Sequence, residues 1–105
     1  MKVGYFINLI SKTKHFKEIQ NTKTVKKLLT YNYNTEVSLS YLKQLKYVVM
    51  DKLKITDFNI NQQFKDKGVF LAYVDGELYG SWFDERYAYI NSILKVLRMY
   101  KKLQN

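Results

Sequence analysis

The side chains that could do acid–base or metal chemistry are few in this 105-residue chain, and they stand apart. His15 is the single histidine, cysteine is absent, and no carboxylate pair flanks His15 at metal-ligand spacing. Asp75 and Glu77 stand in a turn pattern, and Asp84 opens a helix pattern, so neither group indicates a placed acid and base. The four glycines form no phosphate-binding loop. The sequence predicts a protein that is not an enzyme and uses no metal or cofactor.

Lysine is the abundant charged residue, and it is unevenly distributed. The formal net charge is +9, and residues 1–54 hold eleven lysines against three acidic residues, a net charge of +8 for this half. A one-sided positive field attracts polyanions and speeds their encounter. We therefore expect nucleic acid or a nucleoprotein complex as the partner. Abundant Lys, Tyr, Asn and Ile also fit an AT-rich genome, such as that of a phage or mobile element, and codon bias alone could produce a solvated lysine coat.

The expected nucleic-acid contacts lie on two helices of the basic half. Lysines would bind phosphates, and polar or aromatic neighbours would contact or stack on bases. A helix over 24–31, a helix over 39–54 and a hairpin form the order of a winged-helix domain. The long turn near 32–37 and the absence of arginine before Arg86 argue against that fold. The candidate contact residues are Lys26, Lys27, Ser40, Lys43, Gln44, Lys46, Tyr47 and Lys54.

Two long helices must position these side chains. The first covers about 39–54, where apolar residues recur at helical spacing from Leu42 to Leu53 and the lysines lie off that stripe. The second covers about 85–103 and begins after Asp84, a good N-cap. One or two short helices are expected before them, near 13–20 and from Val25, with a threonine cap.

A hairpin over 69–83 is the clearest signal of the second half. Asp75 and Gly76 suit a two-residue type I′ turn, which places Val74 opposite Glu77. Continuing that register without a break places Val69 opposite Trp82. One face then carries five large apolar residues and is predicted to be the core face: Val69, Leu71, Tyr73, Leu78 and Trp82. The other face, with Phe70 and Tyr79, is the expected surface for a protein partner.

The elements together predict a single α+β domain over residues 1–105. Its small antiparallel sheet would contain the hairpin and a strand from residues 2–10, although residues 2–10 also fit one face of a helix. Residues 55–67 read as a packed loop or a short helix ended by Gly68. The sheet would pack against the two long helices.

The predicted function is non-enzymatic binding of nucleic acid or of a nucleoprotein machine. The alternative is a stoichiometric inhibitor of a host enzyme or defence nuclease, acting through Phe70 and Tyr79. A further alternative is a homodimer in which a copy of the chain covers the second sheet face. No signal peptide and no apolar run of about 18 residues is present, so we expect a cytoplasmic protein with no membrane contact.

Overall fold

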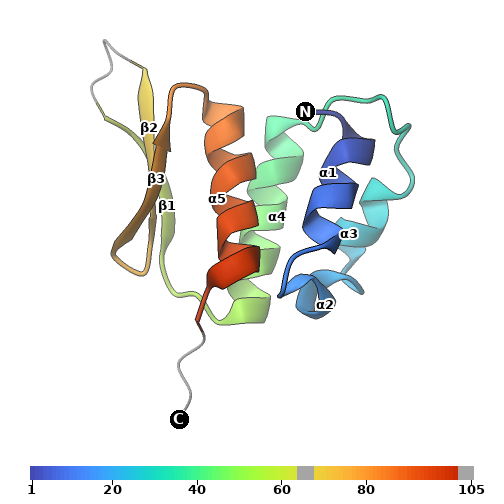
Figure 1. The fold of residues 1–105 in the computed structure, drawn as a ribbon, viewed down its shortest axis with the longest axis horizontal. Helices are drawn as coiled ribbons and strands as arrows, with labels where there is room; N and C mark the ends of the chain where they lie inside the picture. The colour runs from blue at the N-terminus through green and yellow to red at the C-terminus, as the bar shows by residue number, and fades with distance from the viewer. Residues whose placement is uncertain (64–67, 102–105) are drawn as a thin grey trace.

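The structure, a computed structural model, describes residues 1–63 and 68–101, and these form an α+β fold. The helical part contains α1 (Val3–Ser11), α2 (Phe16–Ile19), α3 (Lys23–Leu28) and α4 (Leu39–Leu53). The sheet contains β1 (Phe58–Gln63), β2 (Val69–Val74) and β3 (Glu77–Trp82), and α5 (Glu85–Met99) follows it. The strands pair antiparallel in the order β1-β2-β3. Figure 1 shows the sheet at one end of the molecule, with α5 and then α4 beside it.

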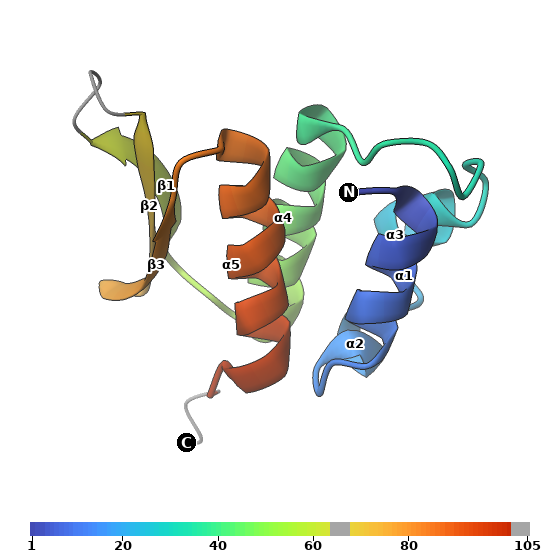
Figure 2. The same ribbon diagram turned by 45° about the horizontal axis from the view of Figure 1, so that its top comes forward.

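The α5 helix lies between the sheet and the remaining helices. It contacts β2 and β3 on one side and α4 on the other, and α1 also touches it. Figure 2 shows the same order of layers after rotation. Because α5 is covered on two sides, its buried positions run almost around the helix and include Ala88, Ser92 and Val96. Ser92 satisfies its buried hydroxyl by donating to the Ala88 carbonyl at 2.6 Å.

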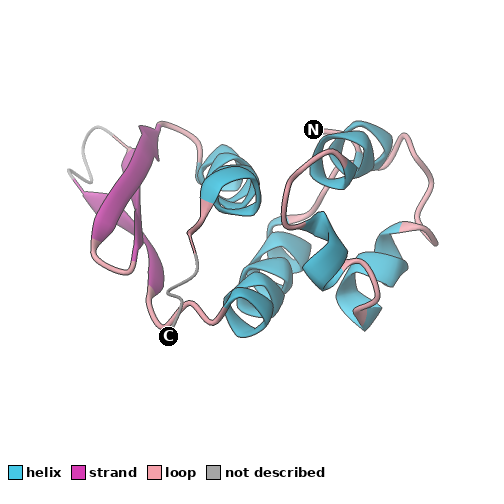
Figure 3. Cartoon of the chain, turned by 60° about the horizontal axis from the view of Figure 1, so that its bottom comes forward, coloured by secondary structure: helices cyan, strands magenta, loops and turns pink. Residues whose placement is uncertain are grey.

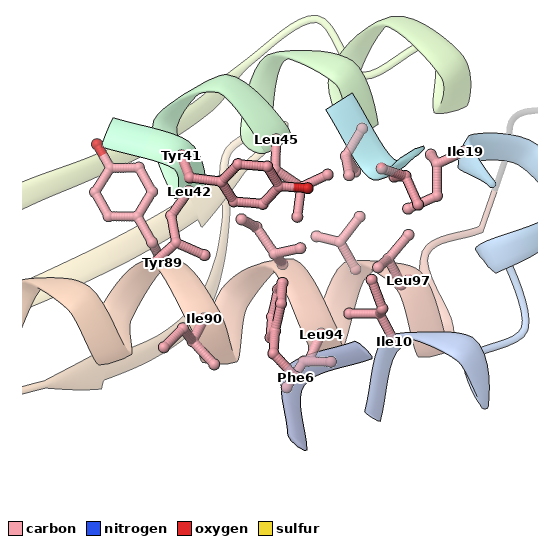
Figure 4. Close-up of a cluster of buried hydrophobic side chains, with 14 of the residues drawn as sticks. Phe6, Ile10, Ile19, Tyr41, Leu42, Leu45, Tyr89, Ile90, Leu94 and Leu97 are labelled. Atoms are coloured by element: carbon pink, nitrogen blue, oxygen red, sulfur yellow. The ribbon is translucent and has the colours of Figure 1, made fainter. Parts of the chain in front are cut away.

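The core lies where α1, α2, α4 and α5 meet, as Figure 4 shows. The predicted stripe of α4 is confirmed, since all four of its apolar residues are buried. The fully buried side chains that face one another across this core include Phe6, Ile10, Ile19, Leu42, Leu45, Ile90 and Leu97. This single cluster holds the long helices in place under the exposed lysines.

The predicted helix starts are confirmed by their caps. The Ser38 hydroxyl accepts from the Tyr41 N–H at 3.1 Å, and the Asp84 carboxylate accepts from the Tyr87 N–H at 3.0 Å. The Thr22 hydroxyl caps α3 at 3.3 Å. These short polar side chains satisfy N–H groups that a helix cannot pair internally. The two long helices, α4 and α5, are the ones that the sequence predicted, although α5 ends at Met99 rather than near 103.

The helix α1 covers all of the segment 2–10 except Lys2, so the predicted N-terminal strand is wrong. In α1, Val3, Phe6 and Ile10 are buried at helical spacing. Its first turn is fixed to the loop before α4, because the Val3 N–H donates to the Thr35 carbonyl at 2.8 Å. The apolar residues of this segment fitted both patterns, and the surrounding helices provide a core that a helical stripe fills.

The third strand comes instead from residues 58–63, which the sequence indicated as a loop or short helix. Phe58 is buried and Ile60 is half-buried, whereas Asn59 and Asn61 are exposed, which is the alternation of a strand with one covered face. β1 pairs with β2, from Phe58 opposite Val74 to Gln63 opposite Val69. The rest of that predicted segment, residues 64–67, lies outside the described residues.

The hairpin register is confirmed next to the turn and wrong beyond it. Glu77 pairs with Val74, and Leu78 pairs with Tyr73. A bulge then shifts the pairing, so that Gly80 rather than Tyr79 lies opposite Ala72 and Phe70 pairs with Trp82. Gly80 has φ 152, which L side chains rarely adopt, and a Cβ there would lie 2.4 Å from the Trp82 ring. Glycine thus permits both the bulge and the close indole contact.

Next to the turn, the core face of the hairpin is the opposite of the predicted one, whereas the bulge returns Trp82 to the inner side, opposite Phe70. Ala72 and Val74 are buried against the helices, whereas Leu78 is 52% exposed. Leu71 and Tyr73 point to the outer side and are half-buried. Both faces of β2 are apolar, so hydrophobicity alone could not choose between them. The position of α5 decides the face, because it covers the side that carries Ala72 (Figure 1).

Candidate nucleic-acid interface

The exposed side of α4 carries most of the predicted contact residues. Ser40, Lys43, Gln44 and Tyr47 are all exposed, and they recur at spacings of three and four along the helix. The Tyr47 ring is 64% exposed. Since the buried stripe of α4 faces the core, these four side chains share the opposite, solvent-facing side. The structure therefore brings them together as predicted.

The lysines of α3 lie beside this surface. Lys26 and Lys27 are exposed in the last turn of α3. The helix is tied to α4 by the Tyr41 hydroxyl, which donates to the Thr24 carbonyl at 2.6 Å. Burial raises the pKa of Tyr41, with a smaller contribution from Tyr31, so this hydroxyl stays a donor. Figure 3 shows α3 and α4 along one broad side of the molecule, and α1 and α5 along the other.

Lys54 follows the end of α4 and is exposed in a left-handed backbone conformation, with φ 59. Its N–H donates to the Met50 carbonyl and closes the helix. The side chain therefore leaves α4 at a fixed position, on the exposed side of the last turn. We call the predicted contact residues that are exposed on α3, on α4 and at Lys54 the α3–α4 basic face: Lys26, Lys27, Ser40, Lys43, Gln44, Tyr47 and Lys54. The exposed carboxylate of Asp51 lies on the same side of α4.

Lys46 does not belong to this face, so its prediction as an exposed contact is wrong. It is 8% exposed, and its Nζ donates to the Phe58 carbonyl at 2.8 Å. The ammonium also lies 4.9 Å from the Tyr47 ring centre. Burial lowers the pKa of Lys46, and nearby Asp57 partly offsets that effect. The start of β1 lies against this side of α4, a long-range contact that the leucine stripe did not indicate.

A second lysine contacts the other edge strand in the same way. Lys95 of α5 donates to the Tyr79 carbonyl at 3.0 Å, and its Nζ lies 5.4 Å from the Tyr79 ring centre. Tyr79 is the extra residue of the β3 bulge, so its carbonyl gains a partner from the helix. Both lysines therefore attach the sheet to the helices.

The two residues predicted to contact a protein partner, Phe70 and Tyr79, are both half-buried. Phe70 shares the inner face of β2 with Ala72 and Val74, and Tyr79 packs against the main core. Burial raises the pKa of Tyr79, and Glu77 adds a smaller effect. Neither ring presents the open outer surface that the sequence predicted, because the helices cover this side of the sheet.

The positive charge of the first half is almost entirely exposed. Of the eleven lysines in residues 1–54, ten are exposed and Lys46 is buried. Among described residues, the ion pairs join the Met1 amino group to Glu36 and His15 to Glu18, and neither uses a lysine. Exposed, uncompensated lysines are the groups that neutralise phosphates and release counterions.

The sheet end has a different charge character. β1, β2 and β3 contain no lysine or arginine, and Asp57, Asp75 and Glu77 are exposed near the hairpin turn. Among the described residues, the charge therefore changes along the molecule, from basic helices to strands that carry no lysine or arginine. A polyanion is attracted to the helical part and repelled from the hairpin turn.

Asp75 organises a junction that the sequence did not reveal. Its Oδ1 accepts from the Thr56 N–H at 3.2 Å, the Thr56 hydroxyl at 2.9 Å and the Asp57 N–H at 3.0 Å. Its Oδ2 accepts from the Tyr100 hydroxyl at 2.6 Å. Partial burial raises the pKa of Asp75, but the bonds from Tyr100, Thr56 and Asp57 outweigh it and the net pKa is lowered. The carboxylate thus joins the turn, the start of β1 and the end of α5.

His15 links the start of α2 to the end of α5 through its backbone and its side chain. Its backbone N–H donates to the Leu97 carbonyl at 2.9 Å, and its Nε2 lies 2.7 Å from the Tyr100 carbonyl oxygen. The imidazole therefore fastens the start of α2 to the end of α5. Within residues 1–63 and 68–101, no group of three or more histidine or acidic side chains is arranged to hold a metal ion.

No protein-family model matches the chain, and no curated protein or solved structure shows a significant match to it. The described helices include none that is long and apolar enough to cross a membrane.

Proposed function

We propose that this protein binds nucleic acid without catalysis, through the α3–α4 basic face. The observation that carries the proposal is the set of exposed lysines on the helical part, none of which forms an ion pair with a carboxylate of the described residues. The four lysines of this face supply phosphate contacts, which are independent of base sequence. Gln44 and Tyr47 lie between Lys43 and Lys54 on α4, where an amide can meet base edges and an exposed ring can stack on an unpaired base.

The geometry of α4 suits this role. Its 15 residues span about 22 Å at 1.5 Å per residue, and the diameter of a helix with its side chains, about 10–12 Å, matches the roughly 12 Å width of a major groove. Its exposed side is free along this length among the described residues, and its buried side is fixed by the core. Lysines on a rigid helix hold fixed positions relative to one another. Such a surface favours duplex DNA or structured RNA, whose phosphates also have fixed spacing, over a flexible single strand.

The test is a charge-matched pair of variants. The face variant changes Lys26, Lys27, Lys43 and Lys54 to glutamine. The control variant removes the same charge from the α1 and α5 side by changing Lys2, Lys12, Arg86 and Arg98 to glutamine, all exposed positions. Binding of labelled duplex DNA, single-stranded DNA and RNA is measured by fluorescence anisotropy at several salt concentrations.

The face variant is expected to bind more weakly, with a salt slope that is flatter by about 0.9 for each lost duplex phosphate contact. The control should keep most of the wild-type slope. Equal losses in both variants would mean that net charge alone attracts the polyanion. Absence of wild-type binding at low salt would refute the proposal and leave the lysines as a solvated coat.

The inhibitor alternative has lost the contact surface that was predicted for it. Tyr79 packs against the main core and Phe70 lies half-buried on the inner face of β2, so the two do not form a fully exposed pair. An inhibitor would have to act through another surface.

A further inference from the structure

We propose that the α3–α4 basic face binds structured RNA at an unpaired base, and that it prefers a base with an exocyclic amino group, such as cytosine. The inference rests on the proposed function and deepens it, since it names the part of the nucleic acid that is recognised. The residues that carry it lie directly opposite the buried stripe of α4, are all exposed, and recur at spacings of three and four. We call them the α4 central stripe: Ser40, Gln44, Tyr47 and Asp51.

The α4 central stripe divides the basic face into phosphate contacts and base contacts. Lys43 and Lys54 lie beside the stripe on α4 and at its end, and the lysines of α3 lie further from it. Lysines contact phosphates, which fix the position of a nucleic acid, whereas an amide, an aromatic ring and a carboxylate can contact bases. The side chains at the centre of the face are therefore of the kind that distinguishes one base from another.

Tyr47 can stack on a base with the open face of its ring. The ring is 64% exposed, and the Lys46 ammonium lies over its other face, 4.9 Å from the ring centre. Lys46 is itself fixed, because its Nζ donates to the Phe58 carbonyl at 2.8 Å. A ring supported on one side loses little conformational freedom when a ligand binds to the other side. Stacking of this kind needs an unpaired base, since neighbouring base pairs cover the faces of a base within a duplex.

Asp51 gives a base on Tyr47 a selective partner. It lies four residues after Tyr47 in α4, a spacing that places Cβ atoms about 5–6 Å apart, so the edge of a stacked base comes within reach of the carboxylate. Within residues 1–63 and 68–101, the ion pairs do not include Asp51. A carboxylate accepts from the amino group of cytosine and is repelled by the oxygen that uracil carries at the same ring position.

The composition of the face favours unpaired RNA bases over the paired bases of duplex DNA. Arginine is the commonest reader of paired guanine, and both arginines of the chain, Arg86 and Arg98, lie on α5 instead. Sequence-specific recognition of RNA uses loops and bulges whose bases stack on aromatic side chains. The lysines would hold the phosphates of a paired stem, and Tyr47 would take the unpaired base beside it.

The test compares RNA hairpins that share one stem sequence, by fluorescence anisotropy at low salt. One hairpin is fully paired, and the others carry a single bulged cytosine, a bulged uracil or an abasic bulge. The wild type should bind the cytosine bulge about tenfold more tightly than the paired and abasic hairpins, the effect of one stacked base. It should bind the cytosine bulge about fivefold more tightly than the uracil bulge, the effect of one hydrogen bond at an exposed site.

Variants assign these ratios to side chains. Tyr47→Ala should lower binding of the cytosine bulge to the level of the paired hairpin and leave the paired hairpin within about twofold, whereas Tyr47→Phe should keep the wild-type ratios. Asp51→Asn removes a negative charge and should strengthen binding of every hairpin, but the preference for cytosine over uracil should disappear, because an amide accepts from one base and donates to the other. Tyr33→Ala is the matched control, because Tyr33 is 63% exposed outside this face and should keep both ratios.

The ratios separate this inference from the proposed function. Equal binding of all hairpins by the wild type, or an equal loss for paired and bulged hairpins in Tyr47→Ala, would overturn recognition of an unpaired base and leave the phosphate contacts in place. A cytosine preference that persists in Asp51→Asn would overturn the role of Asp51. Absence of binding to every hairpin at low salt would refute the proposed function and this inference with it. Circular dichroism confirms that each variant is folded.

Discussion

Replacing Asp75 should destabilise the fold more than the exposure of its side chain indicates. The carboxylate accepts four hydrogen bonds, which join the hairpin turn to Thr56, Asp57 and Tyr100. Each net hydrogen bond contributes about 0.5–1.5 kcal/mol, and the lower end applies here because water can replace lost partners. The four together contribute about 2 kcal/mol by that scale.

The backbone conformation of residue 75 adds to this loss of stability in Asp75→Ala but not in Asp75→Asn. Asp75 has φ 49, where alanine costs about 1 kcal/mol or more and asparagine is tolerated. We therefore expect a loss of about 3 kcal/mol for Asp75→Ala and about 1 kcal/mol for Asp75→Asn, whose amide oxygen can still accept from Thr56 and Asp57. Asp51→Asn, which removes a carboxylate from the exposed side of α4, is the control and should change little.

The effect of Asp75 should depend on pH in a defined direction. Its pKa in the folded state lies below the ordinary 3.8, so its stabilisation is complete above that value and is lost as the pH falls through the folded pKa. The difference between wild type and Asp75→Asn should shrink below about pH 4. Burial, followed by the bond to Asp75, raises the pKa of Tyr100 from 10.0 to about 12. The stabilisation by Tyr100 should therefore be complete below pH 10 and disappear as the pH rises toward 12.

The assay is urea unfolding followed by circular dichroism and by the fluorescence of Trp82, the single tryptophan. A double-mutant cycle with Tyr100→Phe isolates the Asp75–Tyr100 bond, and a charge-assisted bond at an exposed site should give a coupling energy of about 1 kcal/mol at pH 7. A loss below about 1 kcal/mol for Asp75→Ala, together with zero coupling, would show that the junction does not form in solution.

Three further substitutions test other parts of the structure. Gly80→Ala should cost about 1–3 kcal/mol in thermal unfolding, because the new Cβ would lie 2.4 Å from the Trp82 ring, and Trp82→Ala in the same chain should recover part of the loss. Lys46→Met should cost about 1–3 kcal/mol by leaving the Phe58 carbonyl unpaired, and it should not change the salt slope of nucleic-acid binding. Tyr41→Phe removes the bond to α3 and should cost about 1 kcal/mol, a value that chemical unfolding can measure.

Local signals in the sequence were sufficient for the helices of the basic half. The start of the helix near residue 39 and the stripe from Leu42 to Leu53 depend on residues close in the chain, and both are confirmed. Exposure of Lys43 and Lys54 followed from the same stripe. Lys46 was misplaced because β1 widens the buried side of α4, and that contact involves a residue twelve positions away.

The sheet required information that the sequence pattern does not carry. Residues 2–10 fit strand and helix equally, and only packing against α4 and α5 selects the helix. The turn at Asp75 was correct, but the bulge depends on the Gly80 backbone and the Trp82 ring, which pairwise counting from the turn ignores. With both faces of β2 apolar, the covered side was set by α5 and by nothing within the hairpin.

The position of α5 has a consequence for the order in which the fold can form during synthesis. This helix is the last described element to leave the ribosome, yet both the sheet and the α1–α4 helices pack against it. Until α5 emerges, the inner sides of Ala72 and Leu42 remain open to water, so neither the sheet nor α4 has the full apolar cover that stabilises it. The nascent chain should therefore stay loosely structured until α5 is complete and then fold in one cooperative step. Completion of α5 is thus required before the rest of the chain can fold.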